Sequence, residues 1–303
     1  MSTLPVIAAV DGSEDSLRAL EFAIVAARLW EAPLRVLHVR QYAAPARTGD
    51  PAAGSQLSND PVLDRVKDGL TGRSDLPPLE FATAEGAPAR TLPEESAGAQ
   101  LLVLGSRGRG GFASLLLGSN GLASAREADC PVVVVPRPGR EVIEESPVAP
   151  GPRVVVGMPV DSTDESAVAF AFEEAERRGA RLQVVSAYAW PTLVWTAVGD
   201  YVPAVDDKEE ALVECEALAE EVVARHRPRH PRVAAEVTVR DGDAAGHLVS
   251  CSAGAELVVV GRHRRRLTQP GRLLGSVTQA VLLHAAAPIA VVPLKGIEAD
   301  SAG

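Results

Sequence analysis

A glycine-rich segment carries the residues best suited to chemistry. Gly105 and Gly108 are followed, after nine further residues, by Gly118-Ser119. Because glycine has no Cβ, backbone N–H groups near it can come close to an anion. The serine adds a hydroxyl donor at the start of an expected helix, and Arg107 and Arg109 add positive charge. These residue types at this spacing predict a site for phosphate groups.

Two common phosphate-binding patterns do not fit this segment. The P-loop pattern Gly-x-x-x-x-Gly-Lys requires a lysine, and none stands in the corresponding place. The dinucleotide fingerprint belongs after a first strand, with an acidic residue about 20 positions further on, whereas Gly108-x-Gly110-Gly111 follows an expected fourth strand. We therefore expect neither a P-loop nor an NAD site.

Short apolar runs alternate with helical patterns and must position this segment. In the first half of the chain we expect strands at residues 6–10, 34–40, 79–83, 101–105 and 132–135, with helices between them. This alternation predicts an α/β domain with a five-stranded, parallel, doubly wound sheet and helices on both faces. Such sheets bind ligands at the carboxyl ends of strands where the strand order reverses. The site should lie after the first and fourth strands.

The chain repeats itself at about half its length. The stretch 101–105 recurs at 257–261, an offset of 156, and 131–136 recurs at 288–293, an offset of 157. One residue is therefore inserted in the second copy between Gly261 and Gly275. The repeat predicts two tandem domains, at residues 1–138 and 153–295. A linker rich in Pro, Glu and Gly at 139–152 joins them, and 296–303 form a tail.

The glycine spacing resembles the ATP-binding signature of the universal stress protein family, in its tandem two-domain form. The likeness covers nearly the whole chain, including Val10-Asp11-Gly12-Ser13 and Leu37-His38-Val39. It implies Rossmann-like domains and ATP, with Mg²⁺ carried by the nucleotide, and Asp11 on the base or ribose side. Asp11 could equally cap the first helix, and the two roles are compatible. Around adenine, the likeness implies contacts from Ala9, Val10, Val39 and Leu104. At the ribose and phosphates, it implies contacts from Gly105, Gly108, Gly118, Ser119 and Asn120. Arg107 and Arg109 would offset the charge of the phosphates. Asn120 departs from the family's usual apolar residue.

The second copy departs from this pattern. Aligning Ala19 with Ala167 places Pro159 opposite Asp11, although a local slip would bring in Asp161. Arg264 stands where the second glycine belongs, so we expect no ATP in the second domain. The run 262–266 is either an anion clamp of altered geometry or a solvated face. The resemblance implies a structural role for this copy, with pairing through the closing strands 132–135 and 289–292, inside the chain or in a homodimer.

Composition limits the classes of function. The chain has 303 residues and a formal charge of -10, which disfavours nucleic acid and anionic membranes as partners. It has no expected export signal and no apolar run of about 18 residues, so we expect a cytoplasmic protein. Cys130, Cys215 and Cys251 are expected to be reduced, with Cys130 a small buried residue. His226 and His230 flank Pro228, which argues against a zinc pair on one helix, so we expect no metal held by the protein itself.

These observations favour an ATP-binding regulatory or stress-response module with an unidentified protein partner. No His, Glu or Asp occurs within 105–120, so we assign no catalytic residue and expect at most slow ATP hydrolysis. An adenylating enzyme would need a Ser-Gly-Gly-x-Asp-Ser signature after the first strand, and residues 10–16 lack its paired glycines. The remaining alternative is an interaction scaffold that binds no nucleotide.

Overall fold

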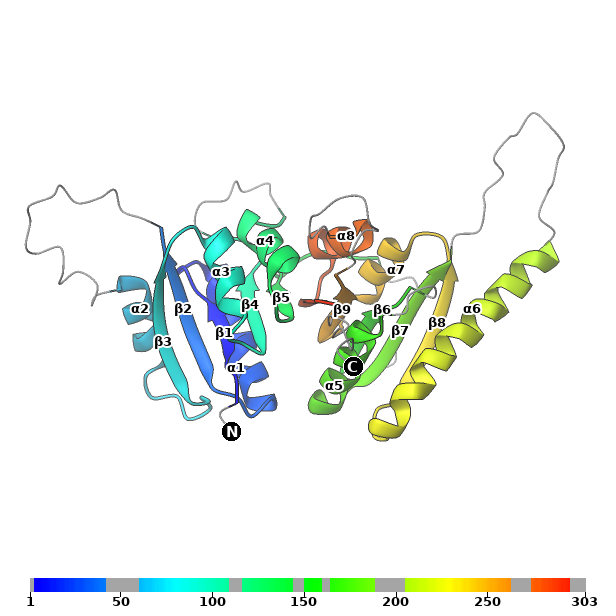
Figure 1. Cartoon of the computed structure of the whole chain (residues 1–303), viewed down its shortest axis with the longest axis horizontal. Coiled ribbons are helices and arrows are strands. Elements are labelled where there is room, and N and C mark those ends of the chain that lie inside the picture. Colours follow the sequence, from blue (N-terminus) through cyan, green and yellow to red (C-terminus); the bar gives the residue numbers. More distant parts are fainter. Residues whose placement is uncertain are drawn as a thin grey trace, which may run out of the picture. The chain divides into compact units, whose positions relative to one another are not determined.

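The structure is a computed structural model that describes residues 3–41, 60–108, 116–143, 150–159, 164–188, 205–262 and 274–294. It divides into two compact units (Figure 1). The first contains Met1–Gly139 together with Pro288–Pro293, and the second contains Arg140–His263 together with Gly275–Ala287.

The first unit is built on a parallel sheet. Its strands are β1 (Val6–Ala9), β2 (Leu34–Arg40), β3 (Leu79–Glu85), β4 (Leu101–Gly105) and β5 (Val132–Val135), in the order β3-β2-β1-β4-β5. In β1, Ile7 stands opposite Arg35 on one side and Leu102 on the other. The order reverses between β1 and β4, which confirms the doubly wound fold and puts the switch point where the sequence placed the site.

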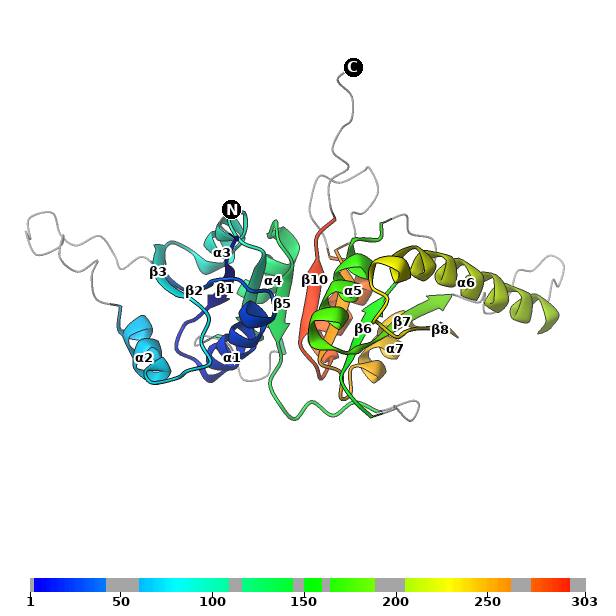
Figure 2. The same cartoon turned by 90° about the horizontal axis from the view of Figure 1, so that it is seen from below.

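In the described part of this unit, the sheet is covered by the helices α1 (Glu14–Leu29), α2 (Pro61–Leu70), α3 (Pro88–Ser96) and α4 (Ser119–Glu127). Figures 1 and 2 show α1 and α2 over one face and α3 and α4 over the other. Strands buried on both faces need continuous apolar sequence, and β4 and β5 supply it. Helix α1 buries a stripe at helical spacing that includes Ala19, Ala23 and Ala27, whose small side chains let it lie close to the sheet.

The second unit repeats most of this architecture. Its parallel strands are β6 (Arg153–Gly157), β7 (Arg181–Tyr188), β8 (Ala235–Asp241) and β9 (Leu257–Gly261), in the order β9-β6-β7-β8. Its helices are α5 (Ser166–Arg178), α6 (Val205–His226), α7 (Ala244–Cys251) and α8 (Ser276–His284), with a 3₁₀ turn at Arg227–Arg229.

The last strand, β10 (Ile289–Val292), groups with the first unit. It pairs antiparallel with β5, so that Ala290 stands opposite Val133. These are the two closing strands that the sequence singled out. Each presents only buried residues, and the hydrogen bonds between them satisfy backbone groups that an open sheet edge would leave unpaired.

The segment Ser96-Ala97-Gly98-Ala99 of the first copy recurs as residues 252–255 of the second, and its serine makes corresponding contacts in both. Ser96 Oγ donates to Pro93 O (2.5 Å) and accepts from the Asp129 amide (2.8 Å). Ser252 Oγ donates to Val249 O (2.6 Å) and accepts from the Ala286 amide (2.8 Å). The recurring Ser-Ala-Gly-Ala segment is therefore structural in both copies, because it fixes the end of one helix to the turn before the closing strand.

Arg140, in the segment expected to be a linker, is held by the second unit. Its Nη1 donates to Ala285 O (2.8 Å) and Leu282 O (3.4 Å), carbonyls at the carboxyl end of α8. A cation there satisfies the last carbonyls of a helix and complements its dipole.

Elsewhere Cys130 is buried, as the sequence predicted. Within the described ranges, no helix is long and apolar enough to cross a membrane.

Candidate functional site

The ends of β1 and β4 bring Asp11 and Gly108 together. After the buried Val10 the chain turns at Gly12, whose φ of +77° lies in the left-handed region that favours glycine. Asp11 Oδ1 accepts hydrogen bonds from the Ser13 amide (2.9 Å) and Ser13 Oγ (2.6 Å). A Cβ on Gly108 would lie 2.6 Å from Asp11 Oδ2. The second glycine of the segment is therefore needed beside the carboxylate.

Ser13 links Asp11 to α1. It is the N-cap of that helix, and its Oγ accepts from the Ser16 amide at 3.2 Å. The Asp11 amide in turn donates to Ser16 Oγ at 3.3 Å. The cap of α1 is therefore Ser13 and not Asp11, which the sequence offered as a possible cap, and the same serine holds the Asp11 carboxylate.

Gly105 has a packing role that the glycine spacing did not reveal. A Cβ at this position would lie 2.6 Å from both the carbonyl carbon and the carbonyl oxygen of Asp15. Main-chain atoms cannot move aside as a flexible side chain can. Glycine at 105 therefore allows the first turn of α1 to lie against the end of β4.

Asp15 is a buried carboxylate next to this contact, and the sequence reasoning missed it. It is 1% exposed. Arg137, two residues after β5, donates its Nε–H to Oδ1 (2.9 Å) and Oδ2 (2.8 Å), and Arg18 forms a second ion pair with the same carboxylate. The pair ties the end of β5 to the start of α1. The available signal was an acidic residue four positions before Ala19, on the buried stripe of the helix.

The start of α4 meets the same loop. The Gly118 amide donates to Ser106 O at 2.7 Å, and Gly118 is the N-cap of the helix without a side-chain cap. The first amides of α4, at Ser119 and Asn120, have no intrahelical acceptors in a regular helix. Ser106 is 1% exposed, and its Oγ has no hydrogen-bond partner within the described structure. The start of α4 therefore places backbone N–H groups that lack intrahelical acceptors next to the Gly105–Gly108 turn.

The remaining predicted residues lie along the same edge of the sheet. Strand β1 ends at Ala9, one residue before the expected end, and Val10 follows it. Val39 lies near the end of β2 and Leu104 near the end of β4, and all but Ala9 are buried. Arg107 is partly buried, between Ser106 and Gly108. Arg109 lies outside the described residues, as do Gly110 and Gly111. The structure thus brings the described members of the set to one edge.

The second unit departs at the position of Asp11. Met158 takes the place of Val10, and its amide donates a hydrogen bond to Val185 O at 2.9 Å. Pro159 follows it. Helix α5 begins at Ser166, which aligns with Arg18, so it starts one turn later than α1. An Asp-x-Ser turn does occur there: Asp164 Oδ1 accepts from the Ser166 amide (3.1 Å) and Oγ (2.7 Å). The second unit therefore has its Asp-x-Ser turn at Asp164–Ser166, at the later start of its helix.

The loop after β9 also differs. A Cβ on Gly261 would lie 3.8 Å from the Cβ of Ala167, an ordinary contact, so no described residue requires glycine here as Asp15 does at Gly105. Thr278 Oγ1 donates to Gly261 O at 2.9 Å. Asp161, Arg264 and the other residues of the basic run after Arg262 lie outside the described residues.

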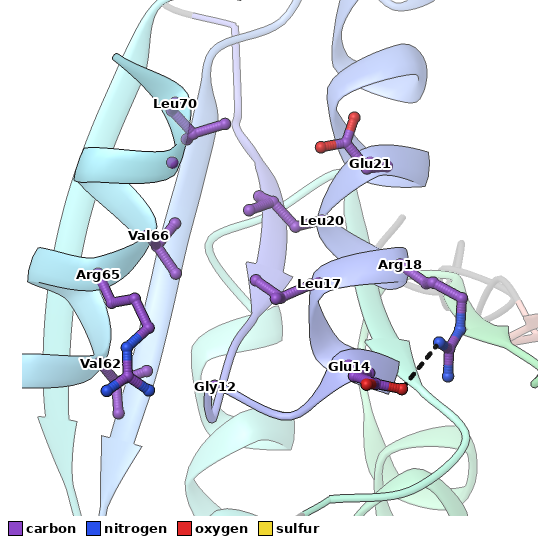
Figure 3. Close-up of a pocket in the computed structure, with 11 residues that line it drawn as sticks. Gly12, Glu14, Leu17, Arg18, Leu20, Glu21, Val62, Arg65, Val66 and Leu70 are labelled. Atoms are coloured by element: carbon purple, nitrogen blue, oxygen red, sulfur yellow. Dashed lines mark ion pairs between the residues drawn. The ribbon is translucent and has the colours of Figure 1, made fainter.

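A cavity between α1 and α2 was not predicted from the sequence. It is open to solvent on one side, has a volume of about 530 Å³ and is lined largely by apolar side chains of the two helices, with Gly12 at one end (Figure 3). None of the residues predicted to bind a ligand lines it. The sequence pattern predicted helices on both faces of the sheet, but not a space between two of them.

The comparisons with known proteins define the class. The family model described as "Universal stress protein family" matches residues 4–136 and 152–293. The chain belongs to the universal stress protein family, in its tandem form. It is 34% identical over 299 residues to a universal stress protein of Mycobacterium tuberculosis, covering 94% of this chain and 96% of that one. A relative from Mycolicibacterium smegmatis is 31% identical over 299 residues, covering 95% and 96%.

Solved structures agree in fold. A universal stress protein from Archaeoglobus fulgidus gives a TM-score of 0.65 at 18% identity, covering 95% of this chain and 98% of that chain. A putative universal stress protein from Pseudomonas aeruginosa gives 0.61 at 16% identity, covering 96% and 94%. The family and the tandem α/β fold predicted from the sequence are confirmed. The domain limits at residues 138 and 153 and the ligand-binding residues stay predictions.

Proposed function

We propose that the first unit binds ATP and that the protein acts as a cytoplasmic, nucleotide-responsive regulatory module of the stress response. The supporting observation is the close approach of Gly108 to Asp11 beside the uncapped start of α4. A carboxylate that can accept from hydroxyl or amino groups next to backbone donors that favour phosphate suits a nucleotide.

Each described residue has a place in this proposal. Asp11 would accept from the ribose or base. The backbone at Gly105, Gly108, Gly118 and Asn120, with the Ser119 hydroxyl, would hold ribose and phosphates. The two arginines at 107 and 109 would offset phosphate charge, with Mg²⁺ carried by the nucleotide. Ala9, Val10, Val39 and Leu104 supply apolar surface for adenine. The triphosphate of the bound nucleotide would add negative charge to a protein whose formal net charge is already -10.

Binding without rapid turnover follows from the side chains present. Residues 105–120 contain no His, Asp or Glu to orient an attacking water. Among the described residues, the acidic group that a Cβ on Gly108 would meet is Asp11, whose Oδ1 already accepts two hydrogen bonds from Ser13. We therefore propose that nucleotide occupancy, not hydrolysis, is the signal, and that the second unit is mainly structural because Pro159 replaces Asp11.

The test is direct chemical identification. The full chain is purified without added nucleotide, its small molecules are released by heat, and they are identified and counted. ATP or ADP at about one per chain supports the proposal. Two per chain would show that the second unit also binds, and none, even after incubation with ATP, would favour the interaction scaffold.

A matched pair of variants assigns the bound nucleotide to the loop. Gly108→Glu places a carboxylate against Asp11 and should abolish nucleotide binding. Gly98→Glu adds the same charge at an exposed glycine whose Cβ would meet only Glu95 O, at 3.9 Å, and should bind normally. Nucleotide retained by Gly108→Glu would show that the loop assignment is wrong.

A further inference from the structure

The cavity between α1 and α2 is large enough for a small molecule. Its volume of about 530 Å³ lies within the range of roughly 300 to 1,000 Å³ that is usual for ligand pockets. Figure 3 shows Leu17 and Leu20 reaching into it from α1, with Val66 and Leu70 facing them from α2. Leu17 remains 42% exposed, so part of the apolar wall is open to water.

The wall that α2 contributes to the cavity is an elongated apolar stripe, because of how its residues repeat along the helix. Val62, Val66 and Leu70 are four residues apart and form one stripe of the helix. At 1.5 Å per residue this stripe runs for roughly 12 Å. All three are at most 6% exposed and offer only carbon to an occupant. The shape suits an extended apolar chain.

The charges around the cavity leave one cation uncompensated. Glu14 pairs with Arg18 (4.0 Å), and Glu21 pairs with Arg73 at 2.6 Å. In Figure 3 Arg18 turns away from α2 toward Glu14. Arg65 is exposed and makes no ion pair or hydrogen bond with the described part of the chain. Its guanidinium lies at the same end of the cavity as Gly12 (Figure 3).

We propose that this cavity binds a linear fatty-acid carboxylate, with the acyl chain along the Val62-Val66-Leu70 stripe and the carboxylate on Arg65. Each methylene buried along the stripe strengthens binding, and the guanidinium fork matches a carboxylate. The site is distinct from the proposed nucleotide site, since none of that site's residues lines it. It lies beside it, because Gly12 follows Asp11 directly.

The experiment measures binding of decanoate to the full chain by calorimetry, with decanol as the matched ligand that lacks the carboxylate. Arg65→Gln should weaken decanoate by about fivefold, as expected for one exposed charge pair, and leave decanol unchanged. Leu17→Glu puts a like charge on the wall and should abolish decanoate binding. Val25→Glu is its control, since Val25 is also an exposed apolar residue of α1, at 48%, but does not line the cavity.

Other outcomes would overturn the proposal. They are an absence of saturable decanoate binding, an equal loss in Val25→Glu, or an Arg65→Gln effect as large on decanol as on decanoate. Saturating ATP should leave decanoate binding in place. Competitive displacement by ATP would show that the cavity is part of the nucleotide site. Nucleotide counted after heat release reports on the proposed function separately, so either proposal can fail alone.

Discussion

The backbone of Gly108 passes so close to Asp11 that a Cβ there would lie 2.6 Å from Oδ2 of the carboxylate. Asp11 cannot simply turn away, because its other oxygen is held by the amide and the hydroxyl of Ser13. The segments that contain Asp11 and Gly108 are far apart in the chain. They approach this closely because residue 108 carries a hydrogen atom in place of a side chain.

Gly108→Ala should reduce nucleotide affinity by about tenfold, which corresponds to about 1.4 kcal/mol. The added methyl displaces the Asp11 carboxylate and loosens its bonds to Ser13, while the φ of Gly108 is not among the positive ones and suits alanine. Titration of ATP into the purified variant measures the effect. Thermal unfolding should stay close to wild type because the position is exposed. Unchanged affinity would mean that Asp11 does not contact the nucleotide.

Gly118→Asp should separate helix capping from ligand binding. Gly118 has φ -79° and ψ 157°, the conformation of an N-cap, and a Cβ there meets nothing closer than 3.5 Å. Aspartate is a better N-cap than glycine by a few tenths of a kcal/mol, so the variant should fold at least as well. Its carboxylate would occupy the donors meant for phosphate, and nucleotide binding should fall at least tenfold.

The matched control is Gly275→Asp, at the N-cap of α8, which has φ -63° and ψ 156° and also lacks a side-chain cap. It should leave the nucleotide count unchanged. Equal losses in the two variants would argue against assigning the nucleotide to the first unit.

Asp60→Asn tests an electrostatic contribution to the stability of the first unit. Asp60 caps α2 through the amides of Val62 (3.0 Å) and Leu63 (3.2 Å). Its Oδ2 lies 2.7 Å from His38 Nδ1 and accepts from Thr83 Oγ1 at 2.9 Å. Burial raises the pKa of this carboxyl, but the hydrogen bonds outweigh burial and leave the pKa below its usual 3.8.

A lowered pKa in the folded state stabilises the protein above the unfolded value, and this stability is lost as the pH falls through the folded value. Wild type should therefore lose more stability than Asp60→Asn between about pH 5 and about pH 3. Asparagine keeps the cap, so the neutral-pH cost should be about 1 kcal/mol. Urea unfolding across this pH range measures both, and parallel pH profiles would contradict the assignment.

Ser96→Ala and Ser252→Ala should destabilise by similar amounts. Each removes the acceptor of a backbone amide, that of Asp129 or Ala286, and costs about 1 to 2 kcal/mol. Replacement by threonine, which keeps the hydroxyl, is the control for the lost oxygen. Urea unfolding followed by circular dichroism measures the change. A much larger loss at one serine would show that the two repeats do not share this role.

Much of the fold could be predicted because apolar runs and the internal repeat report it directly. Strands expected at 34–40, 101–105 and 132–135 have those bounds in the structure. Strand β3 extends beyond the expected residue 83 to Glu85, since Ala84 and Glu85 continue the pairing with Val39 and Arg40. This strand has only half-buried and exposed residues, so an apolar pattern could not mark its end.

The site was predictable only where spacing carried the information. Glycine and serine positions located the loop, but the buried Asp15–Arg137 pair depends on the end of β5 meeting the start of α1, which no local pattern records. The α1–α2 cavity depends on the size of side chains from two helices. The packing role of Gly105 likewise requires knowing which main-chain atoms stand opposite it.

The later start of α5 has a consequence for how the two copies tolerate mutation. In the first copy the opening turn of α1 presses main-chain atoms against Gly105, so that even alanine would displace the helix. In the second, the nearest atom of the described residues to a Cβ on Gly261 is the Ala167 methyl, 3.8 Å away. Among the described residues, alanine at 261 would therefore meet only an ordinary contact. The glycine of the first copy is required by the packing of α1 against β4, whether or not a ligand is bound.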